Sequence, residues 1–445
     1  MTLPHATAMP SPVEAEDAYF ASNPPPRHLD EHTSRAKAFI DGHAGAGRRV
    51  VLVTSGGTTV PLEKQTVRFI DNFSAGTRGA TSAEYFLAAG YAVIFLHREF
   101  SLLPYSRHFS HSKDCFLDFL RDDDEADGAE GRVGVRAGDV VKVRAVLRDY
   151  RRANEAGLLL MLPFVTIGDY LHELRAVSRL MGPLGARGLL YLAAAVSDFF
   201  VPPERMAEHK IQSTDVVAQL ERQQQQRPHD GASSGEEPES KKRKTRAEED
   251  EDRDEEHGTG SKTRNGQHQQ QLPQERRNPP GISANDDQDE QDEVFDNFDA
   301  SPRVPRSKRL VIDLDPVPKF LKNLVDGWAP QGMIVSYKLE TDPAILVHKA
   351  RASLDRYQHH LVIGNLLATR KWEVVFVSPG RDDRWLRVPP PGGQAGWGDA
   401  EGRPLRPDEL PREDPDTEIE ELIIPAVAEL HDAHVAADKA KARLG

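Results

Sequence analysis

The sequence has a single cysteine, Cys115, among its 445 residues. One thiol forms no internal disulfide and cannot supply a cysteine-rich zinc site, so both kinds of cross-link are excluded within the chain. The cysteine lies in the amphipathic stretch KDCFLDFL. We therefore expect a buried structural thiol rather than a nucleophile.

Long apolar runs are also missing. No stretch approaches the roughly 20 apolar residues that a membrane-spanning helix needs, and the N-terminus lacks the charged start and apolar core of a signal peptide. The net charge of -14 argues against a nucleic-acid binder. We predict a cytoplasmic protein with neither a membrane nor a nucleic acid as partner.

The composition changes sharply near residue 221. Hydrophobic residues make up only 38% of the chain, with a mean hydropathy of -0.58, and the segment 221–307 has almost no aromatic or β-branched residues before its end. Such a segment cannot bury enough apolar surface to offset its backbone entropy. We predict a disordered low-complexity insertion. Its basic run KKRKTR (241–246) is a candidate nuclear import signal, which would make the nucleus a second location. The alternative is that the run is only solvated chain, as basic runs beside acidic ones usually are.

Patterned sequence flanks this insertion. We expect one domain formed by 35–220 and 308–445, preceded by an N-terminal extension, 1–34, and we expect the acidic stretch 121–134 to be a loop. Apolar and β-branched runs predict strands at 49–54, 92–96, 188–196, 309–314, 333–339, 361–364 and 372–377. Helical patterns lie at 78–89, 139–154, 168–182, 317–327 and 343–358.

This alternation of strands and helices predicts an α/β fold with a mostly parallel sheet flanked by helices. Ligands of such sheets bind beyond the carboxyl ends of the strands, where the strand order reverses. The loops that follow the predicted strands are therefore the first places to look for a site.

A glycine loop, VLVTSGGTTVP, follows the first predicted strand. It presents Gly56, Gly57 and Thr58, where small residues permit close approach and backbone amides can face a phosphate. A plain tight turn is the alternative. Neither GxGxxG nor GxxxxGK[ST] occurs in this loop, so the common dinucleotide and Walker patterns are absent from it.

The next segment, VRFIDNFSAGTRGA (67–80), is unusually polar for a connection between a strand and a helix. The residues that carry this polarity or allow close approach are Arg68, Asn72, Ser74, Gly76 and Arg78. A capped helix start with Ser74 or Thr77 as the cap explains one hydroxyl, but not two arginines and an asparagine. Free amides at a helix start favour an anion.

Two later segments carry further candidates. AAAVSDFF places Ala194 and Ala195 where a flat ligand can approach the backbone, followed by Asp198, and Lys210 lies in EHKIQS. A lone lysine is usually a solvated charge, although this one follows a strand. In SYKLETDPA and the helix after it, the candidates are Tyr337, Lys349 and Arg351. Those two basic residues belong either to a solvent-facing surface or to a nucleoside triphosphate site.

Together these motifs resemble phosphopantothenate–cysteine ligase (phosphopantothenoylcysteine synthetase) of the eukaryotic type, in the family's order over about 35–220 and 308–378. The resemblance implies a modified Rossmann-like fold and condensation of 4'-phosphopantothenate with L-cysteine in coenzyme A synthesis. It also implies an acyl-nucleotide intermediate, release of pyrophosphate and a homodimer in which the partner contributes to the site. Other coenzyme A pathway enzymes are further expected partners.

The resemblance also implies residue roles. Lys210 matches a lysine implicated in forming the acyl-nucleotide, and Asn72 matches an asparagine implicated in its conversion to the amide. Arg68 is the candidate for binding the carboxylate or phosphate of the substrate. Near the nucleotide the resemblance places Ala195, Asp198 and Tyr337.

The nucleotide expected from the resemblance is ATP, with the bacterial CTP as the alternative. Mg²⁺ would be held mainly by phosphate oxygens and waters, so no protein metal ligands are predicted. A nicotinamide-dependent oxidoreductase is the alternative function, but it leaves Lys210, Asn72 and the two arginines without a role. A non-catalytic protein that acts through its insertion is a third hypothesis.

Overall fold

The computed structural model describes residues 11–109, 116–122, 133–211, 310–390, 397 and 402–444. Cys115 and the predicted insertion 221–307 lie outside these ranges. The described residues all belong to one compact unit. Within them, no helix is both long and apolar enough to cross a bilayer.

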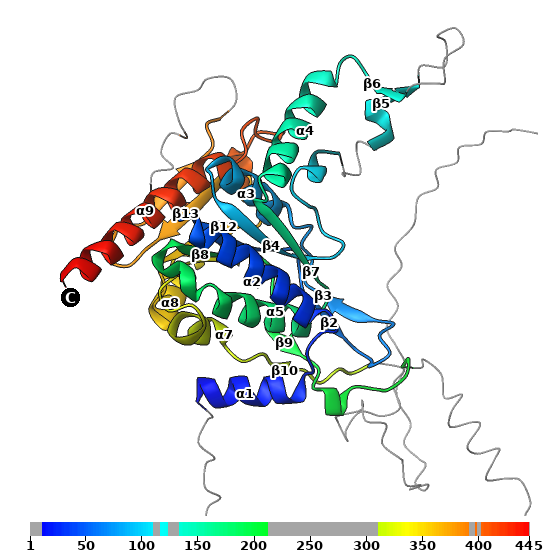
Figure 1. Cartoon of the computed structure of the whole chain (residues 1–445). Helices are drawn as coiled ribbons and strands as arrows, with labels where there is room; N and C mark the ends of the chain where they lie inside the picture. Colours follow the sequence, from blue (N-terminus) through cyan, green and yellow to red (C-terminus); the bar gives the residue numbers. More distant parts are fainter. Residues whose placement is uncertain are drawn as a thin grey trace, which may run out of the picture. The chain divides into compact units, whose positions relative to one another are not determined.

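An eight-stranded sheet forms the centre of this unit (Figure 1), in the order β14-β13-β12-β11-β8-β1-β4-β7. The six strands from β12 to β7 are parallel, and β13 and β14 continue the sheet antiparallel. Their bounds are β1 (Val50–Ser55), β4 (Ala92–Arg98), β7 (Leu159–Phe164), β8 (Gly188–Leu192), β11 (Met333–Glu340), β12 (Leu361–Leu366), β13 (Glu373–Val377) and β14 (Arg384–Arg387). The predicted α/β fold with a mostly parallel sheet is confirmed.

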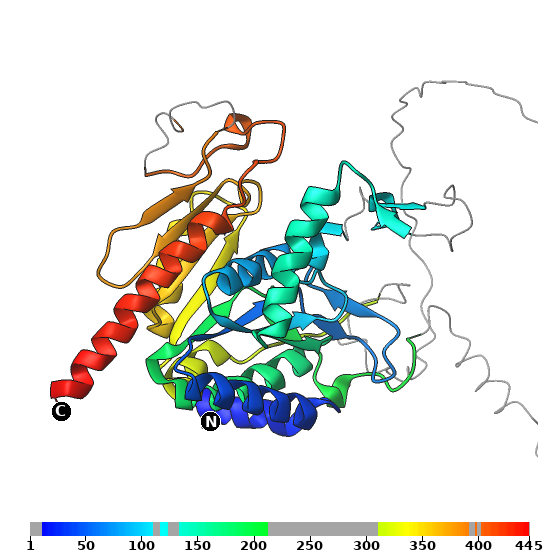
Figure 2. The ribbon, with the colours of Figure 1, turned by 45° about the horizontal axis from the view of Figure 1, so that its top comes forward.

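Helices cover both faces of the sheet, and the longer ones are α1 (Pro12–Ser22), α2 (Leu29–Gly45), α3 (Thr77–Ala88), α4 (Val140–Glu155), α5 (Ile167–Leu180), α8 (Leu346–Tyr357) and α9 (Glu420–Leu444). Helix α3 lies on β1 and β4 and contacts α9, which Figure 2 shows beside the strands at the other end of the sheet. Helices α2 and α5 contact each other and lie against β1, β4 and β7. The crossovers β1–α3–β4 and β7–α5–β8 run in opposite directions along the sheet, so right-handed connections place α3 and α5 on opposite faces. Coverage on both faces explains why every residue of β1 is buried.

Short strands complete the fold: β2 (Thr59–Pro61), β3 (Phe69–Asp71), β5 (Leu120–Asp122), β6 (Val133–Val135), β9 (Phe199–Phe200) and β10 (Asp315–Pro316). Strands β2 and β3 form a hairpin that joins the end of β1 to the start of α3. The hairpin contains residues 67–71 of the polar segment 67–80, and α3 contains residues 77–80.

Several predicted elements differ from the structure. The strand predicted at 309–314 is wrong: residues 310–314 are irregular and partly line the core, and β10 begins only at Asp315. The strand predicted at 188–196 ends at Leu192. The helix predicted at 317–327 is a short α7 (Phe320–Asn323) followed by a π-helical turn, Leu324–Trp328.

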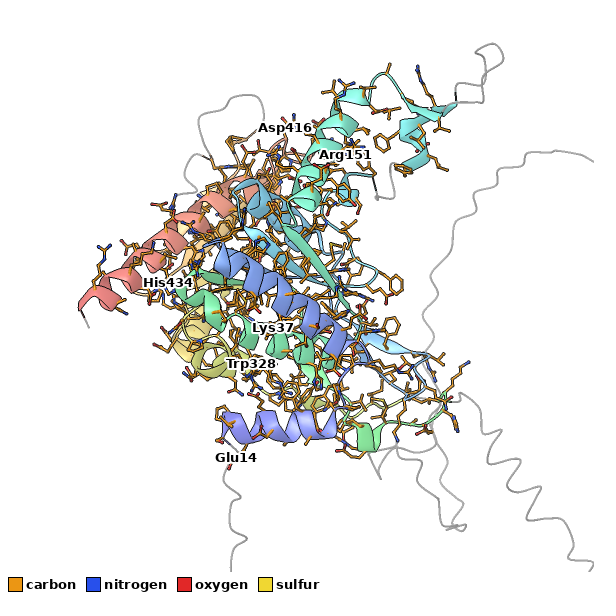
Figure 3. All side chains as sticks on the ribbon, in the orientation of Figure 1. Glu14, Lys37, Arg151, Trp328, Asp416 and His434 are labelled. Atoms are coloured by element: carbon orange, nitrogen blue, oxygen red, sulfur yellow. The ribbon has the colours of Figure 1, made fainter. Side chains whose placement is uncertain are left out.

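The N-terminal residues form two helices that were not predicted. Glu16 of α1 is buried, and its carboxylate accepts hydrogen bonds from Asn323 (2.6 Å) and from the indole of Trp328 (3.2 Å; Trp328 is labelled in Figure 3). Helix α2 spans residue 34, where the predicted extension ends. The division into domains stays a prediction.

Buried histidines hold α9 against the rest of the unit. His431 of α9 is fully buried; its Nε2–H donates to the carbonyl of Ala186 (2.9 Å), and its Nδ1 accepts from the hydroxyl of Tyr91 (3.0 Å). Burial lowers the pKa of His431 to about 4, and likewise those of His359 and His360. These imidazoles are therefore neutral in the folded protein at pH 5 to 7.

We predict that acid destabilises the protein through these histidines. In the unfolded chain a histidine takes up its proton near pH 6.5, so below that pH the unfolded state binds more protons than the folded state. The stabilisation is complete above about pH 6.5 and is lost as the pH falls toward 4. Thermal unfolding should show that His431→Gln has a smaller difference in Tm between pH 7 and pH 5 than the wild type. His348→Gln, at an exposed position of α8, is the control, and an equal difference in all three proteins would contradict the prediction.

Candidate active site

The strand order reverses at β1 and β8. Strand β4 follows β1 in the chain and pairs with one of its edges, whereas β8 pairs with the other edge. Ligands of open α/β sheets bind at such a point, beyond the carboxyl ends of the strands. The residues there are the glycine loop after β1 and the alanines after β8, as the sequence predicted.

Backbone hydrogen bonds join these two strand ends. The amide of Ala195 donates to the carbonyl of Gly56 (2.8 Å), and the amide of Thr58 donates to the carbonyl of Ala195 (3.0 Å). The Thr58 hydroxyl accepts from the amide of Ser197 (3.0 Å), and Thr58 is fully buried. The structure therefore gives Thr58, a predicted phosphate ligand, the role of holding the two loops together.

Asn72 comes against the glycine loop from the β2–β3 hairpin. Its amide donates to the carbonyl of Thr58 (3.2 Å). A Cβ atom added to Gly57 would lie 1.7 Å from the carbonyl oxygen of Asn72, a distance that Cβ atoms do not adopt. Glycine at position 57 is therefore required for Asn72 to lie at the end of β1.

The start of α3 lies beside the same loop. Gly76 is the N-cap, with φ 82° and ψ 10°, and no side chain caps the helix. The hydroxyl of Ser55 donates to the carbonyl of Gly76 (3.0 Å), whereas that of Ser74 accepts from its amide (3.4 Å). Neither Ser74 nor Thr77 is therefore the cap. The first-turn amides of α3 remain available to an anion beyond the end of β1.

Arg78, in that first turn, has partners within the chain. Its Nη1 donates to the carboxylate of Glu420 (2.7 Å) and its Nη2 to the carbonyl of Arg370 (2.6 Å). The guanidinium lies 5.8 Å from the ring centre of Tyr337, whose hydroxyl pairs with that of Tyr191. Burial raises the pKa of Tyr337 well above its ordinary value, so this phenol stays protonated. Arg78 thus joins α3 to the start of α9, which differs from the expected contact with an anion.

Arg68 lies at the tip of the hairpin, next to the segment that carries Lys210. The amide of Lys64 donates to the carbonyl of Ala207 (2.9 Å), and that of Gln65 donates to the carbonyl of Glu208 (3.2 Å). The structure therefore brings Arg68 and the Lys210 segment together, and it places both on the tip rather than beside the glycine loop.

Glu63 connects these two segments, and no motif in the sequence predicted this role. It is fully buried, and its Oε1 accepts from the Nε of Arg68 (2.9 Å) and the amide of Ile211 (3.3 Å). Its Oε2 accepts from the amides of Val67 (3.3 Å) and Arg68 (3.0 Å). Burial alone raises the pKa of Glu63, but the hydrogen bonds from Arg68, Ile211 and Val67 outweigh it and hold the pKa below its ordinary value.

The remaining candidates near β8 are accessible. The amide of Ala194 donates to the Thr54 hydroxyl (3.2 Å). The small side chains of Ala194 and Ala195 are half-buried. Asp198 is exposed, and its carboxylate lies 3.4 Å from the Nζ of Lys319. These residues border the switch point.

Two basic candidates on α8 lie elsewhere. Arg351 pairs with Asp383 (2.6 Å), in the loop between β13 and β14. Because β13 is antiparallel to β12, this loop lies at the amino ends of the parallel strands. That position speaks against the expected nucleotide contact of Arg351. Lys349 is exposed on the same helix.

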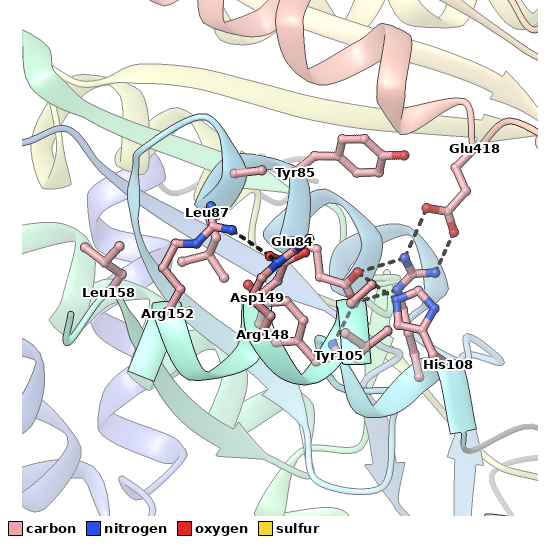
Figure 4. Close-up of a pocket in the computed structure, with 15 residues that line it drawn as sticks. Glu84, Tyr85, Leu87, Tyr105, His108, Arg148, Asp149, Arg152, Leu158 and Glu418 are labelled. Carbon is pink, nitrogen blue, oxygen red and sulfur yellow. Dashed lines mark hydrogen bonds and ion pairs between the residues drawn. The ribbon is translucent and has the colours of Figure 1, made fainter. Parts of the chain in front are cut away.

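A cavity of about 410 Å³ lies between α3 and α4, apart from these residues (Figure 4). Arg107 donates to Glu84 (2.7 Å) and to Glu418 (2.6 Å), and His108 lies 3.0 Å from Glu84. The cations here thus already have carboxylate partners, so the cavity does not compete with the switch point as an anion site. Among the described residues, no group of three or more His, Cys, Asp or Glu side chains is placed to hold a metal ion.

Known proteins resemble this chain over most of its length. The phosphopantothenate–cysteine ligase CAB2 of Saccharomyces cerevisiae is 40% identical over 430 residues, which is 96% of this chain and 88% of the relative. The human phosphopantothenate–cysteine ligase is 36% identical over 342 residues, or 76% of this chain and 79% of the relative. No protein-family model matches the chain.

A solved structure of a Cab2 mutant in complex with phosphopantothenate-cysteine has a similar fold. The TM-score is 0.64 at 37% identity, and the match covers 95% of this chain and 99% of the other. These likenesses define an enzyme of the ligase class. The chain belongs to the phosphopantothenate–cysteine ligase family, which confirms the resemblance of its motifs and sets aside the oxidoreductase alternative.

Proposed function

We propose that this enzyme condenses 4'-phosphopantothenate with L-cysteine in coenzyme A biosynthesis, through an acyl-nucleotide, with ATP converted to AMP and pyrophosphate. Family membership supports the overall reaction. The observation that carries the two-step path is the position of Asn72, held against Gly57 at the switch point and beside the uncapped start of α3. We assign the amide donor to Asn72 and phosphate binding to the first-turn amides of α3, both near the end of β1.

In the first step, a carboxylate oxygen of the substrate attacks the α-phosphorus of ATP, forms a C–O–P linkage and expels pyrophosphate. The ammonium of Lys210 offsets the charge that builds on the phosphates, and the first-turn amides of α3 bind phosphate oxygens. Mg²⁺ bound to the triphosphate would neutralise part of the charge on its phosphates, and no described side-chain cluster of this chain is needed to hold it. We assign the base to the region of Ala194 and Ala195, with Asp198 as its hydrogen-bond acceptor.

In the second step, the amine of cysteine attacks the acyl carbon, AMP leaves with the bonding electrons of the C–O bond, and the nitrogen loses a proton. The carbonyl oxygen gains negative charge as the amine attacks. A hydrogen bond from the Asn72 carboxamide stabilises this oxyanion without adding a competing charge. The second step therefore depends on Asn72.

The hairpin gives the substrate its orientation. Arg68 and Asn72 flank β3, four residues apart, so their side chains lie on the same side of the strand, about 13 Å apart in extended chain. 4'-Phosphopantothenate is an elongated molecule with a phosphate at one end and a carboxylate at the other. We assign its phosphate to Arg68 and its carboxylate to the Asn72 end.

The reaction is tested by a product assay. The purified chain, given 4'-phosphopantothenate, L-cysteine, Mg²⁺ and either ATP or CTP in parallel, should form amide, nucleoside monophosphate and pyrophosphate in equal amounts, faster with ATP. A reaction without cysteine is the control, and it should yield no amide. Nucleoside diphosphate and inorganic phosphate as products would contradict the acyl-nucleotide path.

The two steps should fail separately in two variants. Lys210→Gln should slow pyrophosphate release by about 10²-fold or more, since it removes the charge that stabilises the leaving group. Asn72→Ala should retain a burst of pyrophosphate and lose about 10²-fold in amide formation. Rapid-quench kinetics measures both products. Lys37→Gln and Asn154→Ala, at exposed helical positions, are the matched controls. Unchanged rates in Lys210→Gln and Asn72→Ala would refute these roles.

We also propose that two copies of the chain associate through the hairpin. Val67, Phe69 and Phe73 are 56%, 49% and 93% exposed, which is unusual for large apolar side chains so close together in the chain. A second copy of the chain is the partner that the family resemblance implies, and it would cover this exposed apolar surface. Cytoplasmic location, nuclear import through 241–246 and association with other enzymes of the pathway stay predictions.

Light scattering tests this association. The wild type should have the mass of a dimer, and Phe73→Asp should shift it to the monomer because a charge would be buried at the interface. Val141→Asp, at an 80% exposed position of α4, should not change the mass. A monomeric wild type, or a dimer that tolerates Phe73→Asp, would rule out this surface.

A further inference from the structure

Glu63 is a buried carboxylate that the reaction itself does not require. It is 0% exposed, yet it lies in the short connection between β2 and β3, and among the described residues its carboxylate accepts hydrogen bonds from Arg68, Val67 and Ile211. These partners belong to the two segments that carry the proposed phosphate ligand and the proposed lysine. We propose that Glu63 is a positioning residue that fixes Arg68 and Lys210 relative to each other. This inference rests on the proposed function.

The geometry of Arg68 supports this role. Its Nε and Nη2 lie 2.9 Å and 2.8 Å from the Oε1 of Glu63, and its Nη2 also donates to the carbonyl of Ile211. Only Nη1 has no partner among the described residues. The side chain is 38% exposed. Arg68 therefore meets an anion end-on, through Nη1, because Glu63 occupies the other edge of the guanidinium.

The segment that carries Lys210 is fixed at both sides of this residue. Before it, the carbonyls of Ala207 and Glu208 accept from the amides of Lys64 and Gln65. After it, the amide of Ile211 donates to Glu63, and its carbonyl accepts from Arg68. A displacement of the Arg68 guanidinium therefore displaces the backbone next to Lys210. The carboxylate of Glu63 therefore connects Arg68 to the segment that carries Lys210.

The charge of Glu63 matters as well as its shape. Every partner of the Glu63 carboxylate is an N–H group, and an ionised carboxylate accepts a hydrogen bond from each of them. A glutamine at this position would turn one acceptor into an amide donor facing N–H groups, and it would leave a buried donor unsatisfied. An aspartate keeps the charge but is one methylene shorter. Glutamine therefore tests the charge of the side chain at position 63, and aspartate tests its length.

Kinetics of three variants test the proposal. Glu63→Gln should raise the KM for 4'-phosphopantothenate and slow pyrophosphate release, each by about tenfold or more, because small displacements at a reacting site are costly. Glu63→Asp should recover part of this loss. Glu373→Gln is the matched control: Glu373 is also buried (1% exposed) and ion-paired, with Arg387 at 2.9 Å, but it lies on β13 at the antiparallel end of the sheet. Its Tm should fall while its KM and its rate of pyrophosphate release stay within about twofold of the wild type.

The outcomes separate the possibilities. If Glu63→Gln lowers Tm but leaves KM and pyrophosphate release like those of Glu373→Gln, Glu63 is a structural residue only and the proposal is wrong. If Glu63→Gln does not fold, Glu63→Asp decides the question by the same two rates, with wild-type values again refuting the proposal. A wild type that forms no pyrophosphate and no amide refutes the proposed function instead, before any variant is measured.

Discussion

The site depends on main-chain contact between three loops that are far apart in sequence. Strand β1 ends in Gly56 and Gly57, the turn after β8 bonds to this end through Ala195, and Asn72 lies across it. Backbone atoms can approach this closely only where Cβ atoms are absent or small. Glycine and alanine therefore determine where Asn72 lies relative to the end of β1.

Much of the fold could be predicted from the sequence, because parallel strands covered on both faces are continuous apolar runs. The same signal failed at 310–314, where Ile312 and Leu314 pack against the core from irregular chain. Pro163 weakens the signal of β7, which lies at the edge of the sheet, where a proline is tolerated. In α9 the buried residues lie only in the first half of the helix. The helical repeat of apolar residues therefore does not continue along its length, and α9 was not predicted.

The site was predicted in part, for a comparable reason. Motifs give residue types and local spacing, and these were enough to single out Asn72 and the glycine loop. They do not give partners, and the partner decides what a charge does. Arg78 pairs with Glu420, 342 positions away, and Glu63 bonds to Ile211, 148 positions away. No local pattern contains either pair, so one arginine was expected to face an anion and the glutamate was overlooked.

The end-on exposure of Arg68 has a consequence for selectivity. Two parallel N–H groups would match a planar carboxylate, whereas a single nitrogen can donate to an oxygen of either a carboxylate or a phosphate. On the proposed assignment, Arg68 therefore discriminates little between acids by their chemical type. On this assignment, an acid is selected by its length, because it must reach from Arg68 to Asn72.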